Sequence, residues 1–145
     1  FFIMPTLARF ELEVHTRIAE GKPVTGDILN GIMRDLYAEG YGETMSDDPE
    51  RTGITWAQFG HLYVPYYTFQ YATGISAANA LAEMVRNGGA EQAANYRKFL
   101  AAGSSVYPLD ALKMAGIDMT TPEPIEKAFA VLAGLVDRLE SLIEE

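Results

Sequence analysis

Apolar residues recur every three or four positions along most of the chain, which is the period of a helix with one buried face. The first such segment spans residues 7–19, and its stripe consists of Leu7, Phe10, Val14 and Ile18. Gly21 and Pro23 end it. A second segment opens with Thr25, a favoured N-cap residue, and extends to Gly40. The pattern therefore predicts two helices before the first loop.

The middle of the chain alternates between turn-forming and helical composition. Tyr41–Gly53 is rich in Gly, Pro and Asp, which predicts a loop. Ile54–Phe59 follows as a short helix with Trp56 as its apolar anchor. Proline is favoured in the first turn of a helix, so we expect Pro65 to open a further helix that continues to Val85.

The last third of the chain predicts three more helices, at residues 90–102, at residues 108–115 and at the C-terminal end. Thr121 is the expected N-cap of the last one and Pro122 its first residue. Its apolar stripe consists of Ile125, Phe129, Leu132, Leu135, Val136, Leu139 and Leu142. No alternating strand pattern with hairpin turns is found. The sequence predicts an all-α fold of about seven helices, with residues 1–145 as a single segment.

Composition supports a folded chain. With 145 residues, of which 48% are hydrophobic, the chain is long enough for one domain with a core. The N-terminal residues Phe1-Phe2-Ile3-Met4-Pro5 have no basic region and no small-residue cleavage site, so they do not predict a signal peptide. Because the chain begins inside an apolar run without an initiator Met, we expect it to be part of a longer protein.

Charge and cysteine content limit the possible partners. A net charge of −9 disfavours binding to nucleic acid or to an anionic membrane, and no apolar stretch approaches the ~20 residues that span a bilayer. The absence of cysteine excludes disulfides, thiol catalysis and thiolate metal sites. We expect a soluble, cytoplasmic protein that binds neither nucleic acid nor a membrane.

Metal-binding and nucleophile motifs are absent. The two histidines, His15 and His61, do not have the spacing of the His-Glu-x-x-His motif, and no Gly-x-Ser-x-Gly or phosphate-binding loop is present. We expect no metal ligands in this chain. His15 is interpreted as a partly exposed helix residue beside Glu11 and Glu13.

The segment Gly60–Gly74 carries an unusual concentration of aromatic and polar groups. Four of the eight tyrosines lie within it beside His61, at Tyr63, Tyr66, Tyr67 and Tyr71. Phenol hydroxyls and an imidazole N–H can donate hydrogen bonds to a carbonyl oxygen that becomes negative during acyl transfer, while the rings line a groove. The segment is therefore a candidate site.

Helical spacing would place Tyr67 and Tyr71 on one face of the predicted helix, and Tyr66 and Gln70 on an adjacent face. An aromatic core helix with its hydroxyls at the rim would have the same pattern. The residues alone leave both interpretations open.

Several stretches, in this order, resemble the C-terminal part of the oligoendopeptidase F family, zinc metallopeptidases related to thimet oligopeptidase. They are Arg9-Phe10-Glu11-Leu12-Glu13-Val14-His15, Gly60-His61-Leu62-Tyr63 with Pro65-Tyr66-Tyr67-Thr68-Phe69-Gln70-Tyr71-Ala72-Thr73-Gly74, Tyr107-Pro108-Leu109-Asp110, and Ala115-Gly116-Ile117-Asp118-Met119-Thr120-Thr121-Pro122-Glu123-Pro124. The resemblance covers nearly the whole chain.

The resemblance implies an all-helical peptidase that hydrolyses short peptides. Its zinc ligands, the two histidines of His-Glu-x-x-His and a downstream glutamate, would lie before Phe1. By position, His61 and Tyr66 match the family's histidine and tyrosine that bind the substrate carbonyl and stabilise the tetrahedral intermediate. Tyr63 and Tyr71 are implied as further substrate contacts, and Tyr67 joins them as a substrate-binding candidate.

Three hypotheses of function follow. In the first, the chain is the C-terminal lobe of a zinc-dependent oligopeptidase, inactive alone, with short peptides and the rest of the enzyme as partners. In the second, it is a stand-alone helical module that binds peptides without cleaving them. In the third, it is an acidic interaction protein whose exposed apolar face pairs with a second copy.

Overall fold

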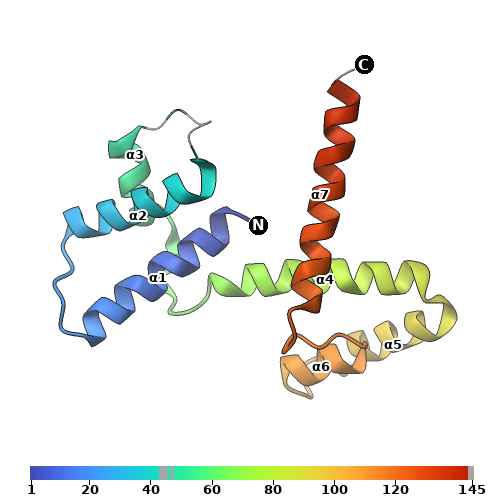
Figure 1. The fold of residues 1–145 in the computed structure, drawn as a ribbon. Coiled ribbons are helices and arrows are strands. Elements are labelled where there is room, and N and C mark those ends of the chain that lie inside the picture. Colours follow the sequence, from blue (N-terminus) through green and yellow to red (C-terminus); the bar gives the residue numbers. More distant parts are fainter. Residues whose placement is uncertain (43–45, 47, 144–145) are drawn as a thin grey trace. The chain divides into compact units, whose positions relative to one another are not determined.

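The computed structural model describes residues 1–42, 46 and 48–143, and over these ranges the chain consists of helices joined by turns. No strand occurs in the described ranges, so the predicted all-α fold is confirmed. Figure 1 shows the seven α-helices of this part of the chain. With the 3-10 helices η2 and η3, they are α1 (Ile3–Ala19), α2 (Gly26–Tyr41), α3 (Pro49–Gly53), η2 (Ile54–Ala57), η3 (Gly60–Tyr63), α4 (Phe69–Asn87), α5 (Gly89–Ala102), α6 (Pro108–Met114) and α7 (Glu123–Ile143).

The chain divides into two compact units, Phe1–Ala72 and Thr73–Glu145. Helix α4 begins in the first unit and continues into the second. Every candidate site residue belongs to the first unit. That residues 1–145 form one segment of a larger catalytic domain stays a prediction.

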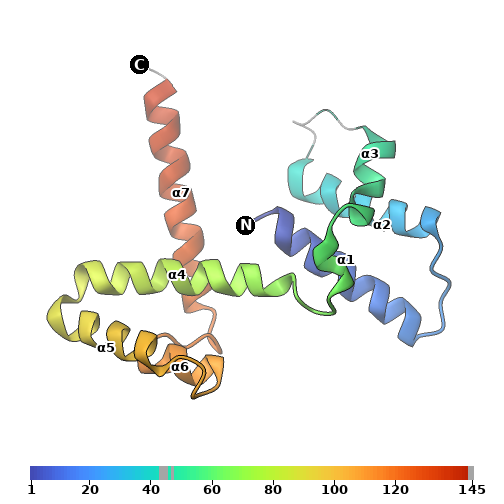
Figure 2. The same cartoon turned by 180° about the vertical axis from the view of Figure 1, so that it is seen from behind.

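The core of the first unit lies between α1 and α2. Leu7 and Met33 are completely buried, and Phe10 is nearly so. The side chains packed around them are partly buried: Met4, Val14, Leu29, Ile32, Leu36, Tyr37, Trp56, Phe59 and Leu62. Because Phe59 and Leu62 belong to this cluster, the start of the candidate segment is anchored on α1 and α2. Figure 2 shows the segment after α3 passing beside α1.

Local signals set the boundary between α1 and α2 as predicted. Gly21 adopts a φ of 69°, and the next amide, of Lys22, donates to the carbonyl of Arg17 at 2.9 Å. This is the left-handed C-terminal arrangement that glycine favours. Thr25 accepts a hydrogen bond from the amide of Ile28 at 3.4 Å, so the predicted N-cap is confirmed.

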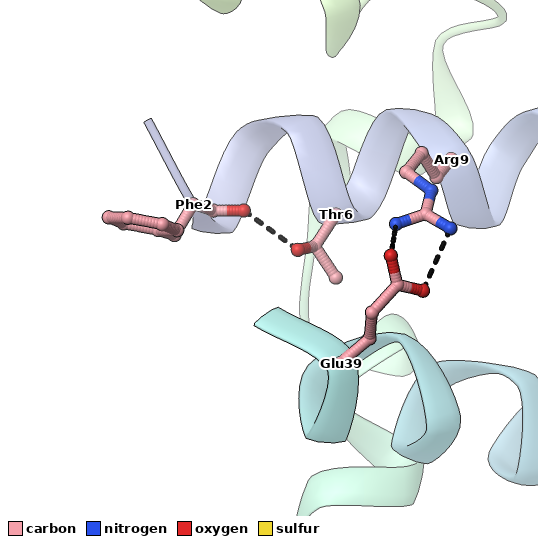
Figure 3. Close-up of polar contacts among 4 residues, drawn as sticks. All are labelled: Phe2, Thr6, Arg9 and Glu39. Carbon is pink, nitrogen blue, oxygen red and sulfur yellow. Dashed lines mark hydrogen bonds and ion pairs between the residues drawn. The ribbon is translucent and has the colours of Figure 1, made fainter. Parts of the chain in front are cut away.

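Helix α1 begins at Ile3, earlier than the predicted start at Leu7. Pro5 lies in the first turn, where amide groups have no partner within the helix, so its missing N–H leaves no hydrogen bond unmade. The hydroxyl of Thr6 donates to the carbonyl of Phe2 at 2.7 Å (Figure 3). The apolar period therefore located the helix but missed its first turn.

An ion pair joins α1 to α2 on the surface. Two guanidinium nitrogens of Arg9 donate to the two carboxylate oxygens of Glu39, at 2.7 and 2.9 Å (Figure 3). Both side chains are exposed, so a pair of this kind contributes only about 0–1 kcal/mol.

The predicted loop before Gly53 contains a helix, α3, so that part of the prediction was wrong. Asp48 accepts a hydrogen bond from the amide of Arg51 at 3.3 Å, and Pro49 is the first helical residue. An Asp N-cap followed by Pro favours the start of a helix, but the loop-like composition of the segment hid this signal. Residues 43–45 and 47 of the predicted loop lie outside the described residues.

The helix predicted at Ile54–Phe59 is shorter than expected and is a 3-10 helix, η2. The hydroxyl of Thr55 donates to the carbonyl of Arg51 in α3 at 3.2 Å. Trp56 does anchor this segment, since it packs on the core and its indole N–H donates to the side chain of Asn30 at 2.8 Å.

The prediction that Pro65 opens a helix was wrong. The 3-10 helix η3 precedes it, a turn contains it, and α4 begins only at Phe69. Tyr66 has a φ of 54°, in the left-handed region, which a right-handed helix does not accommodate. Tyr66 and Tyr67 therefore lie in a turn and not on a helix face.

In the second unit, α5 runs back beside α4 and α6 packs on α5 (Figure 1). The buried core consists of Ala80, Leu81, Ala115 and Ile117, with Met84, Tyr96, Phe99, Leu112 and Met119 packed against it. Gly116 ends the α6 segment as predicted, with a φ of 94°.

Helix α7 begins at Glu123, and the predicted N-cap role of Thr121 was wrong. The carbonyl of Pro122 accepts the amides of Ile125 and Glu126, so Pro122 and not Thr121 is the residue that precedes the helix. The hydroxyl of Thr121 donates to the carbonyl of Asp118 at 2.9 Å in the preceding turn. Pro124 and Ala128 are buried, but after Ala128 all described residues of the helix are exposed except the half-buried Leu132. No helix of the described residues is both long and apolar enough to cross a membrane.

Candidate functional site

His61, Tyr67 and Tyr71 form a cluster of rings. The imidazole of His61 lies 5.7 Å from the ring of Tyr67 and 5.6 Å from that of Tyr71, and the two phenol rings meet edge to face at 5.8 Å. Nε2 of His61 lies 3.1 Å from the hydroxyl of Tyr71. The structure therefore brings together three of the five residues that the sequence nominated.

The hydroxyl of Tyr71 interacts with both other members of the cluster. A hydrogen bond with Tyr67 is the main cause that raises the pKa of Tyr71 above its ordinary value, followed by desolvation and by the charge that Tyr67 would carry. Because a tyrosine is already protonated at neutral pH without this shift, the shift does not change its charge there, and the phenol can donate a hydrogen bond. The cluster is therefore suited to binding an acceptor such as a peptide carbonyl.

Tyr66 is positioned by helix α1. Its amide donates to Oε1 of Glu11, and the hydroxyl of Thr68 donates to Oε2 of the same carboxylate at 3.2 Å. Glu11 is 4% exposed and Thr68 is completely buried. The turn that contains Tyr66 is thus fixed from inside the unit, while half of the Tyr66 surface remains exposed.

The ring of Tyr66 packs against His15. Their centroids lie 5.0 Å apart with the planes tilted by 40°. His15 is half-buried, which agrees with the prediction of a partly exposed helix residue. It also packs against the candidate site residue Tyr66. Neither a hydrogen bond nor a ring contact joins Tyr66 to His61 among the described residues.

Tyr63 stands apart from these groups. It is the last residue of η3, and 73% of its surface is exposed. Within the described part of the chain it makes no ring contact with the His61 cluster. Its predicted substrate contact stays a prediction, as do the roles of the other four residues.

Sequence reasoning missed the part played by Glu11, His15 and Thr68. The role of Glu11 could have been inferred from its position. Helical spacing places Glu11 in the apolar stripe of α1 with Leu7 and Val14, where a carboxylate needs buried hydrogen-bond donors. His15 follows Glu11 by four residues and so shares its face. Nothing in the local pattern of Thr68 predicted its complete burial.

The metal that the resemblance implies has no ligand set in the described residues. They contain no group of three or more His, Cys, Asp or Glu side chains placed to hold a metal ion. The two histidines lie in different groups, His15 against Tyr66 and His61 against Tyr67 and Tyr71. The part of the chain that the structure describes therefore does not fit a zinc site.

Comparison with known proteins defines the class as a peptidase. The family model of Peptidase family M3 matches residues 1–131, and the chain belongs to this family. Family M3 peptidases are generally metal-dependent. The predicted resemblance to the oligoendopeptidase F group is confirmed by the relatives.

Oligopeptidase PepF of Bacillus subtilis (strain 168) is 42% identical over 142 residues, which are 98% of this chain and 21% of that protein. The chromosomal oligoendopeptidase F of Lactococcus lactis subsp. cremoris is 38% identical over 144 residues, covering 99% of this chain and 24% of the relative. The crystal structure of oligoendopeptidase-F from Enterococcus faecium matches 99% of this chain with a TM-score of 0.93 and 39% identity. The matched part is 27% of the Enterococcus faecium chain. The chain thus spans about a quarter of the length of these relatives.

Proposed function

We propose that this chain supplies the substrate-binding and oxyanion-stabilising part of a zinc-dependent oligopeptidase that hydrolyses internal bonds of short peptides. The observation that carries the proposal is the Tyr66 turn: buried contacts to α1 hold its backbone, and the half-exposed phenol packs on His15. The next residue, Tyr67, belongs to the ring cluster of His61. Such fixed donors stabilise a carbonyl oxygen as it becomes negative.

In the proposed site, the hydroxyl of Tyr66 donates to the oxygen that develops charge in the tetrahedral intermediate. His61 binds the substrate carbonyl, and Tyr63, Tyr67 and Tyr71 contact the peptide. Because the transition state carries more negative charge on oxygen than the substrate does, the Tyr66 hydrogen bond lowers the barrier more than it strengthens substrate binding.

We propose that the zinc ligands and the general base come from the rest of the full-length enzyme. The chain alone is then inactive. Its lack of cysteine fits the cytoplasm, the location that we propose for the enzyme. Sequencing the gene upstream of the codon for Phe1 tests this assignment, because the proposal requires a His-Glu-x-x-His motif there. Its absence would favour a peptide-binding module without catalysis.

The kinetic test is Tyr66→Phe in the full-length enzyme. Removing one oxyanion donor should lower kcat by about 10²–10³ and change KM little. Tyr107→Phe is the matched control, since it removes the same hydroxyl from a residue of the second unit that is not among the candidate site residues, and it should leave kcat unchanged. Initial rates on a short internally quenched peptide measure both constants. An unaltered kcat in Tyr66→Phe would remove the role assigned to this residue.

Self-association has its own supporting observation. The apolar stripe of α7 is exposed from Phe129 onward, apart from Leu132. We propose that the rest of the full-length enzyme covers this stripe. A second copy takes its place when the chain is isolated, because large exposed apolar patches favour association.

A further inference from the structure

Glu11 is a buried carboxylate on the core-facing side of α1. Only 4% of its surface is exposed. A carboxylate in this position is costly unless buried donors replace the water that it has lost.

Both donors described above belong to one short turn. The amide of Tyr66 donates to one oxygen of Glu11, and the hydroxyl of Thr68 donates to the other. Glu11 therefore binds the turn at two points, one on each side of Tyr67. Tyr66 itself has the left-handed φ of 54°.

We propose that Glu11 is a positioning residue that holds Tyr66 in its left-handed turn, so that the phenol points consistently toward the substrate. The inference rests on the proposed function for its catalytic consequence. His15, which follows Glu11 by four residues, supports the phenol ring from the same face of α1. Backbone and ring of Tyr66 are thus fixed by two successive turns of one helix.

A general role in folding is the competing explanation, and the two differ in one measurable respect. If Glu11 acts through Tyr66, its loss has no further effect on catalysis once the Tyr66 hydroxyl is gone. If Glu11 only supports the fold, the two losses add. A double-mutant cycle separates these cases.

The experiment uses the full-length enzyme with Glu11→Leu, Tyr66→Phe and the double variant. Glu11→Leu should lower kcat about 10–100-fold, the effect expected when a reacting group is displaced by about 1 Å. The double variant should match Tyr66→Phe alone. Additive losses in the double variant would overturn the inference.

Two further variants control for volume and fold. Glu11→Gln keeps an oxygen for the Tyr66 amide and gains an N–H for the Thr68 oxygen, so it should retain kcat within about threefold. Glu13→Leu changes a neighbouring exposed glutamate and should leave kcat unaltered. If Glu11→Leu fails to fold, Glu11→Asp replaces it, because its shorter side chain cannot reach both donors in the same position.

Hydrogen exchange provides a readout that does not depend on the chemistry. Glu11→Leu should raise amide exchange in the peptide covering residues 64–69, and Glu13→Leu should not. Unchanged exchange in Glu11→Leu would overturn the inference even if kcat falls. If Tyr66→Phe has no effect on kcat, the proposed function fails. In that case faster exchange at residues 64–69 in Glu11→Leu still supports the positioning role.

Discussion

At the scale of single residues, Tyr66 shows how tertiary contacts override local preference. A non-glycine residue in the left-handed region costs of the order of 1–3 kcal/mol and persists only where its surroundings hold it. Here the holding contacts come from Glu11, which lies 55 positions away in the sequence. The conformation of this turn therefore depends on its contact with α1 as well as on its own sequence.

Thr68→Val should destabilise the first unit by about 1–3 kcal/mol. The substitution keeps the volume but removes the only hydroxyl donor described for the Glu11 carboxylate, so a buried acceptor is left unsatisfied. Urea unfolding of the 145-residue chain, followed by the fluorescence of its one tryptophan, Trp56, measures the change.

Thr6→Val is the matched control for this prediction. Thr6 is also buried, but its hydroxyl donates to the carbonyl of Phe2, which also accepts the amide of Thr6 at 3.1 Å. No buried group loses its last partner, so the effect should stay below about 0.5 kcal/mol. Equal losses in the two variants would contradict the importance given to the Glu11 carboxylate.

The sequence located the candidate site better than it described it. The tyrosine cluster beside His61 was visible from composition, and the contact of Tyr67 with Tyr71 does occur. The reason given for that contact was wrong, because Tyr67 lies in a turn and only Tyr71 is on α4. A proline is compatible both with a helix start and with a turn, and the deciding contact, to Glu11, is not local.

At the scale of elements, single residues that favour the start or the end of a helix predicted some helix boundaries correctly. Gly21 ended α1 and Thr25 began α2, as predicted. Thr121 did not begin α7, because the helix begins one residue later than predicted, at Glu123. The helix α3 was missed because the surrounding Gly, Pro and Asp residues outweighed the cap at Asp48. Local pattern therefore predicted the helices but not every boundary.

Two helical glycines should respond in opposite ways to alanine. A Cβ at Gly31, in the interior of α2, would meet no atom within 4 Å, so Gly31→Ala should stabilise the chain by about 0.5–1 kcal/mol through helix propensity. A Cβ at Gly53 would lie 3.2 Å from the backbone oxygen of Asn30. Gly53→Ala should therefore destabilise it by about 1–3 kcal/mol.

Urea unfolding of the isolated chain measures both glycine variants against the wild type. Each substitution adds the same methyl group and reduces the freedom of the unfolded chain in the same way, so the pair controls for the unfolded state. The difference between them reports the close approach of α3 to α2. A gain in stability for Gly53→Ala would show that this approach can relax.

At the scale of the whole molecule, the apolar face of α7 has no surface of this chain that buries most of it in the described residues. Its pattern predicted a buried stripe, yet Leu135, Leu139 and Leu142 are each more than half exposed. The relatives are about four times as long as this chain. A helix with a clear apolar face needs a partner surface to bury it, and that surface is proposed to come from the rest of the enzyme.

The isolated chain should therefore associate as its concentration rises. Leu135→Glu combined with Leu139→Glu places two charges one turn apart on the stripe and should leave a monomer, because burying unpaired carboxylates in an apolar interface is costly. Arg138→Glu is the control, since it alters the net charge by the same two units and should associate like the wild type. Sedimentation velocity over a concentration series distinguishes the three. A wild-type chain that stays monomeric throughout would refute the proposed self-association, and association of the double glutamate variant would place the contact elsewhere on the surface.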